Sequence, residues 1–179
     1  MKKLLIKLTA LSLAALTLGL CSGCGLIFGA DNKKEAGKAL GLDLASAEVV
    51  ESSDSHGGFL GDGLLFLKLD CGGANASEQI ESSEHWKPLP VSANVSTLLY
   101  GGEGWAPIVK IDDPDGGVYD QPLFPRVENG RYFFYDRYDN GVSFDRYNDS
   151  LVLGRFSFNF TVAVYDADTD TLYYCEVDT

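Results

Sequence analysis

The side chains best suited to acid–base chemistry gather beside a glycine-rich turn. His56 follows Ser55, precedes Gly57-Gly58 and lies close in the sequence to Asp54 and Asp62. A histidine titrates near neutral pH, and a neighbouring carboxylate could orient its ring as in a hydrolase. Adjacent Ser and His residues do not by themselves form a nucleophile and a base, because the fold assembles such groups. The same residues also fit a hairpin turn whose glycines serve backbone geometry.

A second glycine-rich segment, residues 112–120, has the composition of a calcium loop. Calcium takes six to eight oxygen ligands, which carboxylates on a flexible loop can supply. The candidate ligands are four aspartates: Asp112, Asp113, Asp115 and Asp120. A solvated acidic turn accounts for the same composition, so a weakly bound calcium ion is the one cofactor considered. The run from Asp166 to Asp170 starts like an EF-hand loop, but Thr171 stands where that loop needs glycine, which favours a hairpin.

Aromatic side chains could line a groove for a sugar or a peptide. Trp86 and Trp105 are the two tryptophans, and nine tyrosines and ten phenylalanines accompany them. In a domain of this size most of these rings must belong to the core or to the sheet surface. A groove is therefore expected only where several of them are exposed together.

The clearest motif is an export signal that ends in a lipid-attachment site. Lys2, Lys3 and Lys7 precede the apolar residues 8–20, a run too short to span a bilayer. Small residues 22–23 then precede Cys24, in an arrangement that resembles the lipobox of bacterial lipoprotein precursors. In such precursors the cysteine thiol receives a diacylglyceryl group. The motif predicts a signal peptide over residues 1–23, lipidation of Cys24 and a tether over residues 24–34.

Two other interpretations of this segment exist. Acylation of Cys21 would put Leu20 immediately before the cysteine, where a small residue is wanted. An ordinary secretory signal would leave both cysteines without a role. With Cys24 lipidated, two acyl chains would anchor the protein stably, because each buried methylene contributes about 0.8 kcal/mol. The predicted location is the extracytoplasmic face of the cell membrane, with the lipid anchor as the membrane contact.

The charge of the mature chain restricts its partners. After residue 23 the chain carries 11 basic and 26 acidic residues, a net charge of −15. Such a surface repels the phosphate backbone of nucleic acids and anionic lipid headgroups. It favours cations, cationic peptides and neutral ligands, and it also keeps an exported protein soluble.

Two cysteines remain in the globular part of the chain. Cys71 is in phase with Leu69 and its apolar neighbours, and Cys175 is in phase with Tyr173 and Val177. Each side chain is therefore expected on an apolar face of its own strand. Export permits one disulfide between Cys71 and Cys175, whereas two buried free thiols on strands that never meet fit the same pattern.

Hydrophobic periodicity predicts one α+β domain over residues 35–179. We expect an antiparallel sheet of about five strands, with two or three short helices on one face. Alternation is strongest from Phe156 to Val164, which predicts one buried and one wetter strand face. The predicted helices cover 33–42, 75–83 and 92–100, and the predicted strands cover 47–53, 64–70, 131–138, 155–165 and 172–177.

Several short strings give the chain a resemblance to small uncharacterised lipoproteins of Gram-positive bacteria. The strings are His56–Phe59, Gly61–Gly63, Trp86–Pro90, Phe158–Thr161, Tyr165-Asp166 and Leu172–Tyr174. The resemblance runs from about Leu42 to Thr179 and implies a membrane-anchored protein that faces outward. No activity is established for that group, so the resemblance assigns no functional residue.

The leading hypothesis is a lipid-anchored extracytoplasmic binding module of the cell envelope, whose partner is a peptide or another envelope protein. It follows from the predicted anchor, the strong acidity and the lack of a convergent catalytic set. One alternative is a hydrolase that uses His56 with Asp54 or Asp62. The other is a weak calcium-binding module around Asp112–Asp120.

Overall fold

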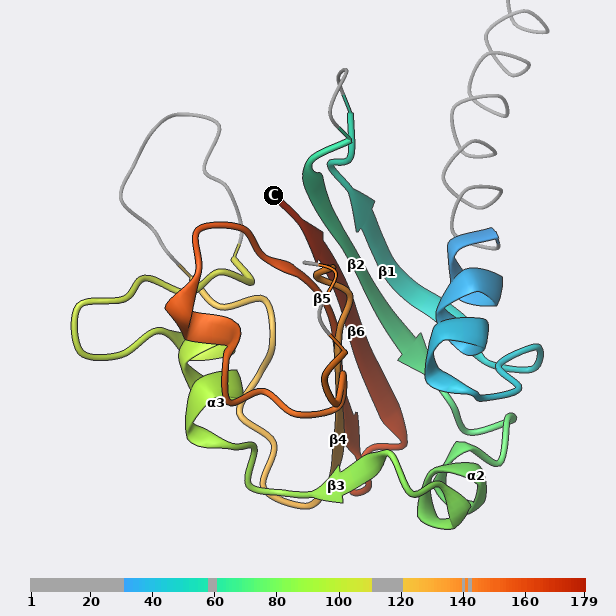
Figure 1. The fold of residues 1–179 in the computed structure, drawn as a ribbon. Helices are drawn as coiled ribbons and strands as arrows, with labels where there is room; N and C mark the ends of the chain where they lie inside the picture. Colours follow the sequence, from blue (N-terminus) through green and yellow to red (C-terminus); the bar gives the residue numbers. More distant parts are fainter. Residues whose placement is uncertain (1–30, 58–60, 111–120, 140, 142) are drawn as a thin grey trace, which may run out of the picture.

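The computed structural model describes residues 31–57, 61–110, 121–139, 141 and 143–179. Six strands form one open sheet in the order β1-β2-β6-β5-β4-β3, and each neighbouring pair is antiparallel (Figure 1). The strands are β1 (Glu48–Asp54), β2 (Gly63–Asp70), β3 (Trp86–Pro88), β4 (Gly130–Asp136), β5 (Asn159–Asp166) and β6 (Thr171–Asp178). The helices are residues 31–40, α2 (Ala76–Ser82) and α3 (Ala93–Tyr100), with a 3₁₀ turn η1 (Val152–Gly154).

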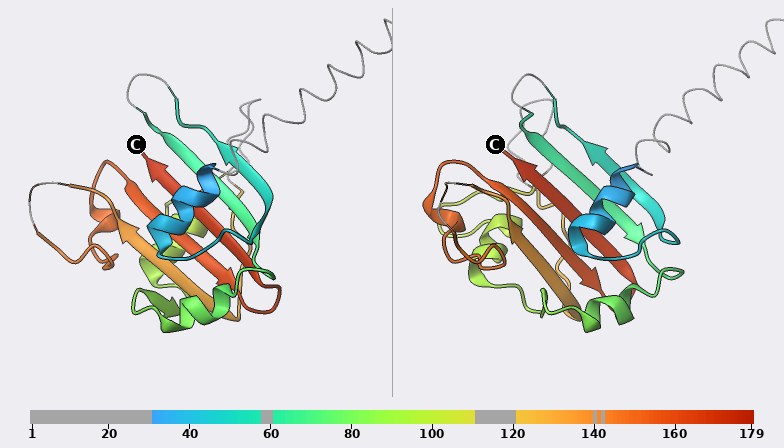
Figure 2. Two further views of the ribbon diagram at one scale, coloured as in Figure 1. Left: turned by 90° about the vertical axis from the view of Figure 1, so that its right-hand side faces the viewer. Right: turned by 45° about the vertical axis from the view of Figure 1, so that its right-hand side comes forward.

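The predicted α+β class is confirmed, although the helices lie on both faces of the sheet and not on one. The helix of residues 31–40 crosses one face and α3 lies on the other (Figure 2). The strand that was not predicted is β3, three residues that form the start of the proline-containing segment 86–90. Asp31 and Asn32, expected in the tether, are helical, as are residues 33–34, which the predicted helix over 33–42 already included.

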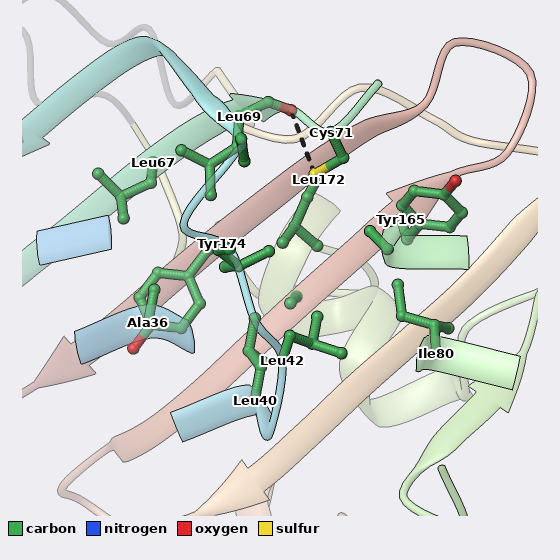
Figure 3. Packing of buried hydrophobic residues seen from close by; sticks show 14 of the residues in the cluster. Ala36, Leu40, Leu42, Leu67, Leu69, Cys71, Ile80, Tyr165, Leu172 and Tyr174 are labelled. Carbon is green, nitrogen blue, oxygen red and sulfur yellow. Dashed lines mark hydrogen bonds between the residues drawn. The ribbon is translucent and has the colours of Figure 1, made fainter. Parts of the chain in front are cut away.

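Because helices cover both faces, the sheet has buried side chains on each of them. On one face, Ala36 and Leu40 of the first helix pack over Leu67 and Tyr174 (Figure 3). The other face is covered by α3 and the loops around it. Its cluster includes Phe66, Val95, Leu98, Phe134, Phe160, Val162, Cys175 and Val177. Each face of the sheet therefore has its own hydrophobic core.

Helix α3 begins and ends at the expected residues. The hydroxyl of Ser92 accepts a hydrogen bond from the backbone N–H of Val95 at 3.2 Å, so Ser92 is the N-cap. Gly101 follows the helix with φ of 71°, a conformation that glycine adopts at little cost. Strand β5, in contrast, begins later than predicted, at Asn159. Phe156 lies before the strand and is exposed.

Cys71 and Cys175 are free and fully buried in the two different cores. The register pairs Phe66 with Cys175, so Cys175 shares a face with Phe66. Cys71 continues the opposite face, that of Leu67 and Leu69. The disulfide considered between the two cysteines does not form in this structure, because the sheet itself separates the thiols.

Both thiols are expected to resist alkylation in the folded protein near pH 8. Burial raises the pKa of Cys71 from 9.0 to about 12, and it raises the pKa of Cys175 well above 9.0. The thiolate is the reactive form, so buried neutral thiols are inert. In denaturant without reductant, mass spectrometry should find both cysteines alkylated. A bridge would instead leave both unmodified until reduction.

The same shifts set the direction of the pH dependence of stability. Below the unfolded-state pKa both states hold the thiol proton, and the contribution to stability is fully present. As the pH rises from about 9 toward 12, the unfolded chain releases these protons while the folded chain retains them. The free energy of unfolding should therefore fall over this range.

Candidate functional site

His56 is held at the mouth of the β1–β2 hairpin by its neighbours in the backbone. Ser55 N–H donates to the carbonyl of Leu64 at 3.0 Å, and Leu64 N–H donates to the Ser55 hydroxyl at 2.9 Å. Gly63 packs directly on the backbone of His56. A β-carbon at position 63 would lie 2.5 Å from the backbone nitrogen of His56. The backbone position of His56 is thus fixed by the ladder and by a glycine that leaves it room.

Both ring nitrogens of His56 face carboxylates. Nδ1 lies 2.7 Å from Oδ1 of Asp54, and Nε2 lies 3.2 Å from Oδ2 of Asp178. The imidazole is one-quarter exposed. Asp54 was a sequence candidate, whereas Asp178 comes from the far end of the chain.

The polar contacts continue from Asp178 across the end of the sheet. Arg137 follows β4, and its guanidinium donates to Asp178 at 3.0 Å and to Glu176 at 2.8 Å. The Tyr174 hydroxyl donates to the second oxygen of Glu176 at 2.9 Å. Burial, with the nearby Glu176 charge, raises the pKa of Tyr174, so its phenol keeps the proton it donates. We call these residues the polar network: Asp54, His56, Arg137, Tyr174, Glu176 and Asp178.

The geometry of the polar network is suited to holding strands together. A general base needs one ring nitrogen free to accept a proton from a nucleophile or a water. In His56 each ring nitrogen already faces a carboxylate oxygen, so neither nitrogen is turned toward a nucleophile or a water. The Ser55 hydroxyl bonds the backbone of β2. The network therefore joins β1, β6 and the end of β4.

Of the other sequence candidates, the structure describes Asp62 but not the proposed calcium ligands or the lipidation site. Asp62 is exposed, and within the described part of the chain no hydrogen bond or ion pair joins it to His56. The proposed calcium ligands Asp112, Asp113, Asp115 and Asp120, and also Cys24, lie outside the described residues. Across the described ranges, no group of three or more His, Cys, Asp or Glu side chains is placed to hold a metal ion.

The segment from Asp166 to Asp170 forms the predicted hairpin turn between β5 and β6. The Asp166 carboxylate accepts from the N–H of Asp168 and from the hydroxyl of Thr169, at 2.9 and 2.8 Å. Asp170 accepts from the Tyr165 hydroxyl at 2.5 Å. These carboxylates serve the turn and its anchorage to β5.

Glu176 and Asp178 are network residues that the sequence analysis missed. A signal for them exists, because Glu176 and Asp178 alternate with the apolar Cys175 and Val177. The alternation places two carboxylates on the Tyr174 face at the end of β6. Which cation meets them there depends on the sheet order and is not visible locally.

Strand β1 is the longer of the two edge strands of the sheet. Six of its seven residues are exposed, including Val50, and it carries Glu48 and Glu51 besides Asp54. Among the described residues, no strand pairs with its outer side. The register shifts between Val49 and Glu51, a bulge of the kind that alters strand twist.

The comparisons with known proteins identify no relative: no family model, no curated protein and no solved structure matches the chain. The resemblance to Gram-positive lipoproteins therefore stays a prediction. Within the ranges that the structure describes, no helix has both the length and the apolar character needed to cross a membrane.

Proposed function

We propose that this chain is a lipid-anchored binding module of the cell envelope that takes up an extended, positively charged segment of a partner protein along β1. The observation that carries the proposal is the exposed, acidic edge strand. An extended peptide can add to such an edge through main-chain hydrogen bonds, while side chains beside the edge select the partner.

Charge selects the kind of partner. Exposed edges invite pairing between copies, and charged side chains and bulges discourage it. With Glu48 and Glu51 on β1 and a mature net charge of −15, a second copy of this chain is repelled. A basic segment of a partner is instead attracted by these negative charges. The acidic edge thus disfavours pairing with a second copy and favours a cationic strand.

The test uses a seven-residue peptide of alternating lysine and valine. In ¹H–¹⁵N NMR titrations, the amide shifts should map to β1, and amide exchange of β1 should slow. The variant Glu48→Gln/Glu51→Gln should bind about five-fold more weakly, since each exposed ion pair contributes about 0.2–1 kcal/mol. The matched control is the same peptide with every backbone nitrogen methylated, which has no N–H group on either side to pair with an edge. Equal binding of both peptides would contradict strand addition.

The anchoring part of the proposal rests on Cys24, and it is tested separately. Cys24→Ser should abolish lipid attachment, because the hydroxyl cannot form the thioether. Metabolic labelling with a fatty acid should mark the unaltered protein and not the variant. Cys21→Ser is the matched control and should label normally. Loss of labelling in Cys21→Ser alone would move the lipid to the other cysteine.

A further inference from the structure

A surface hollow of about 550 Å³ lies at β3, the edge opposite β1. Two segments distant in the sequence form it, and both are polar apart from their rings. The lining residues are Glu84, His85, Lys87, Asp145, Tyr147 and Asn148. None of them belongs to the polar network around His56.

The floor of the hollow is a stacked pair of rings. His85 and Tyr147 are parallel within 3°, with ring centroids 3.7 Å apart. Tyr147 covers one face of His85, and the His85 side chain is still 39% exposed. The other face of the imidazole is therefore turned to solvent, as a flat platform on the protein surface.

The platform is held rigidly from beneath. The Tyr147 ring packs edge-on against Tyr135 and Phe133, with centroid distances of 5.1 and 5.8 Å. Lys87 of β3 donates to the Tyr147 carbonyl at 2.7 Å, which ties the loop to the sheet edge. Because the rings are fixed before a ligand arrives, a ligand would pay little to order them.

Polar groups around the platform still have capacity for a ligand. Asp145 uses one carboxylate oxygen for the Tyr147 N–H, and Asn148 uses its amide oxygen for the Ser150 N–H. Among the described contacts, the second Asp145 oxygen and the Asn148 amide NH₂ remain for other partners. Glu84, with a side chain 88% exposed, adds a further acceptor at the rim. The hollow thus offers both acceptors and donors beside a flat ring.

We propose that this hollow is a binding site for neutral carbohydrate, with a sugar ring stacked on His85 and its hydroxyls bonded to Asp145 and Asn148. The C–H face of a pyranose suits an aromatic surface, and its ring of hydroxyls needs donors and acceptors in one plane. Two carboxylates and the acidity of the chain disfavour phosphorylated and other anionic ligands. The site is independent of the β1 edge, so either proposal can fail alone.

The probes are neutral trisaccharides of N-acetylglucosamine, glucose and mannose. Saturation-transfer difference NMR on the full-chain protein in zwitterionic-detergent micelles should show transfer to at least one of them. His85→Ala should weaken that binding about ten-fold, because the stacking surface is lost. His85→Phe keeps a flat ring and should retain binding, which separates stacking from a disturbed fold.

Trp105→Ala is the matched control for removal of an exposed ring. Trp105 is 42% exposed, and it packs on Phe158 of the opposite core. It should leave carbohydrate binding unchanged. The proposal is overturned if no trisaccharide gives a transfer signal, or if His85→Ala binds as tightly as Trp105→Ala.

Discussion

Replacing Arg155 with alanine should lower the free energy of unfolding by about 3–5 kcal/mol, because it leaves a buried carboxylate without its cation. Asp136 at the end of β4 is 1% exposed, and Arg155 donates to one of its oxygens at 2.7 Å. The other oxygen accepts from the N–H of Tyr138 at 3.0 Å, so the carboxylate cannot turn toward water without losing that bond. Urea denaturation followed by circular dichroism measures the loss.

Arg126→Ala separates the buried ion pair from the packing of a guanidinium on a ring. Arg155 lies 4.5 Å from the ring centroid of Tyr138, and Arg126 lies 4.3 Å from that of Tyr100. Arg126 is exposed, so its loss should cost about 0.5–1 kcal/mol. Adding Asp136→Asn to Arg155→Ala should recover part of the stability, since an amide is cheaper to bury. Equal losses for the two arginine variants would show that the ion pair contributes little.

The strands were predictable where one local pattern decides them, and β5 shows where the pattern misleads. Its Phe160, Val162 and Val164 face the α3 core, as alternation predicts. Thr161 and Ala163 were expected on a wetter face, yet both are buried. Small side chains fit beneath a covering layer, and period-2 alternation cannot distinguish them from a solvated face. The helix of residues 31–40 that covers this face is far away in the sequence.

The cysteines illustrate a related limit. Each was correctly expected on an apolar face of its own strand. Whether two such faces coincide depends on the register, and here the pairing of Phe66 with Cys175 puts the thiols on opposite sides. A slip of one residue would reverse the face of every side chain in the strand. No local property of either strand specifies that register.

The site was predictable to the extent that its members are close in sequence. Asp54 and His56 are two residues apart, so their contact follows from a turn. Asp178 and Arg137 reach them only because β6 lies beside β2 and because β4 and β6 finish at the same end of the sheet. The sequence Asp-Arg-Tyr occurs twice in the chain, at residues 136–138 and 145–147. Its two copies meet through the backbone, with Asp136 N–H donating to the Arg146 carbonyl at 2.7 Å.

Gly63→Ala should destabilise the protein by about 2–3 kcal/mol and displace His56 from its carboxylates. The added β-carbon would lie 2.5 Å from the backbone nitrogen of His56 and even closer to the Cα atom of His56. It would also lie 2.8 Å from the carbonyl carbon of Ser55. These are backbone atoms held by the ladder, so they cannot rotate away, and overpacking of this kind typically costs about 1–3 kcal/mol. Denaturant unfolding gives the stability, and the His56 ring resonances report whether the contacts to Asp54 and Asp178 persist.

Gly154→Ala and Gly61→Ala are the controls that separate the contact with His56 from other effects of replacing a glycine. Gly154 has open space around it and no positive φ, so Gly154→Ala should change stability by less than about 0.5 kcal/mol. Gly61 has equally open space but a φ of 75°, so Gly61→Ala should cost about 1 kcal/mol from backbone strain alone. The contact with His56 is the feature that Gly63 alone has among the three. If Gly63→Ala were no worse than Gly61→Ala, with unshifted His56 resonances, close packing of the two hairpin arms would not be what positions the histidine.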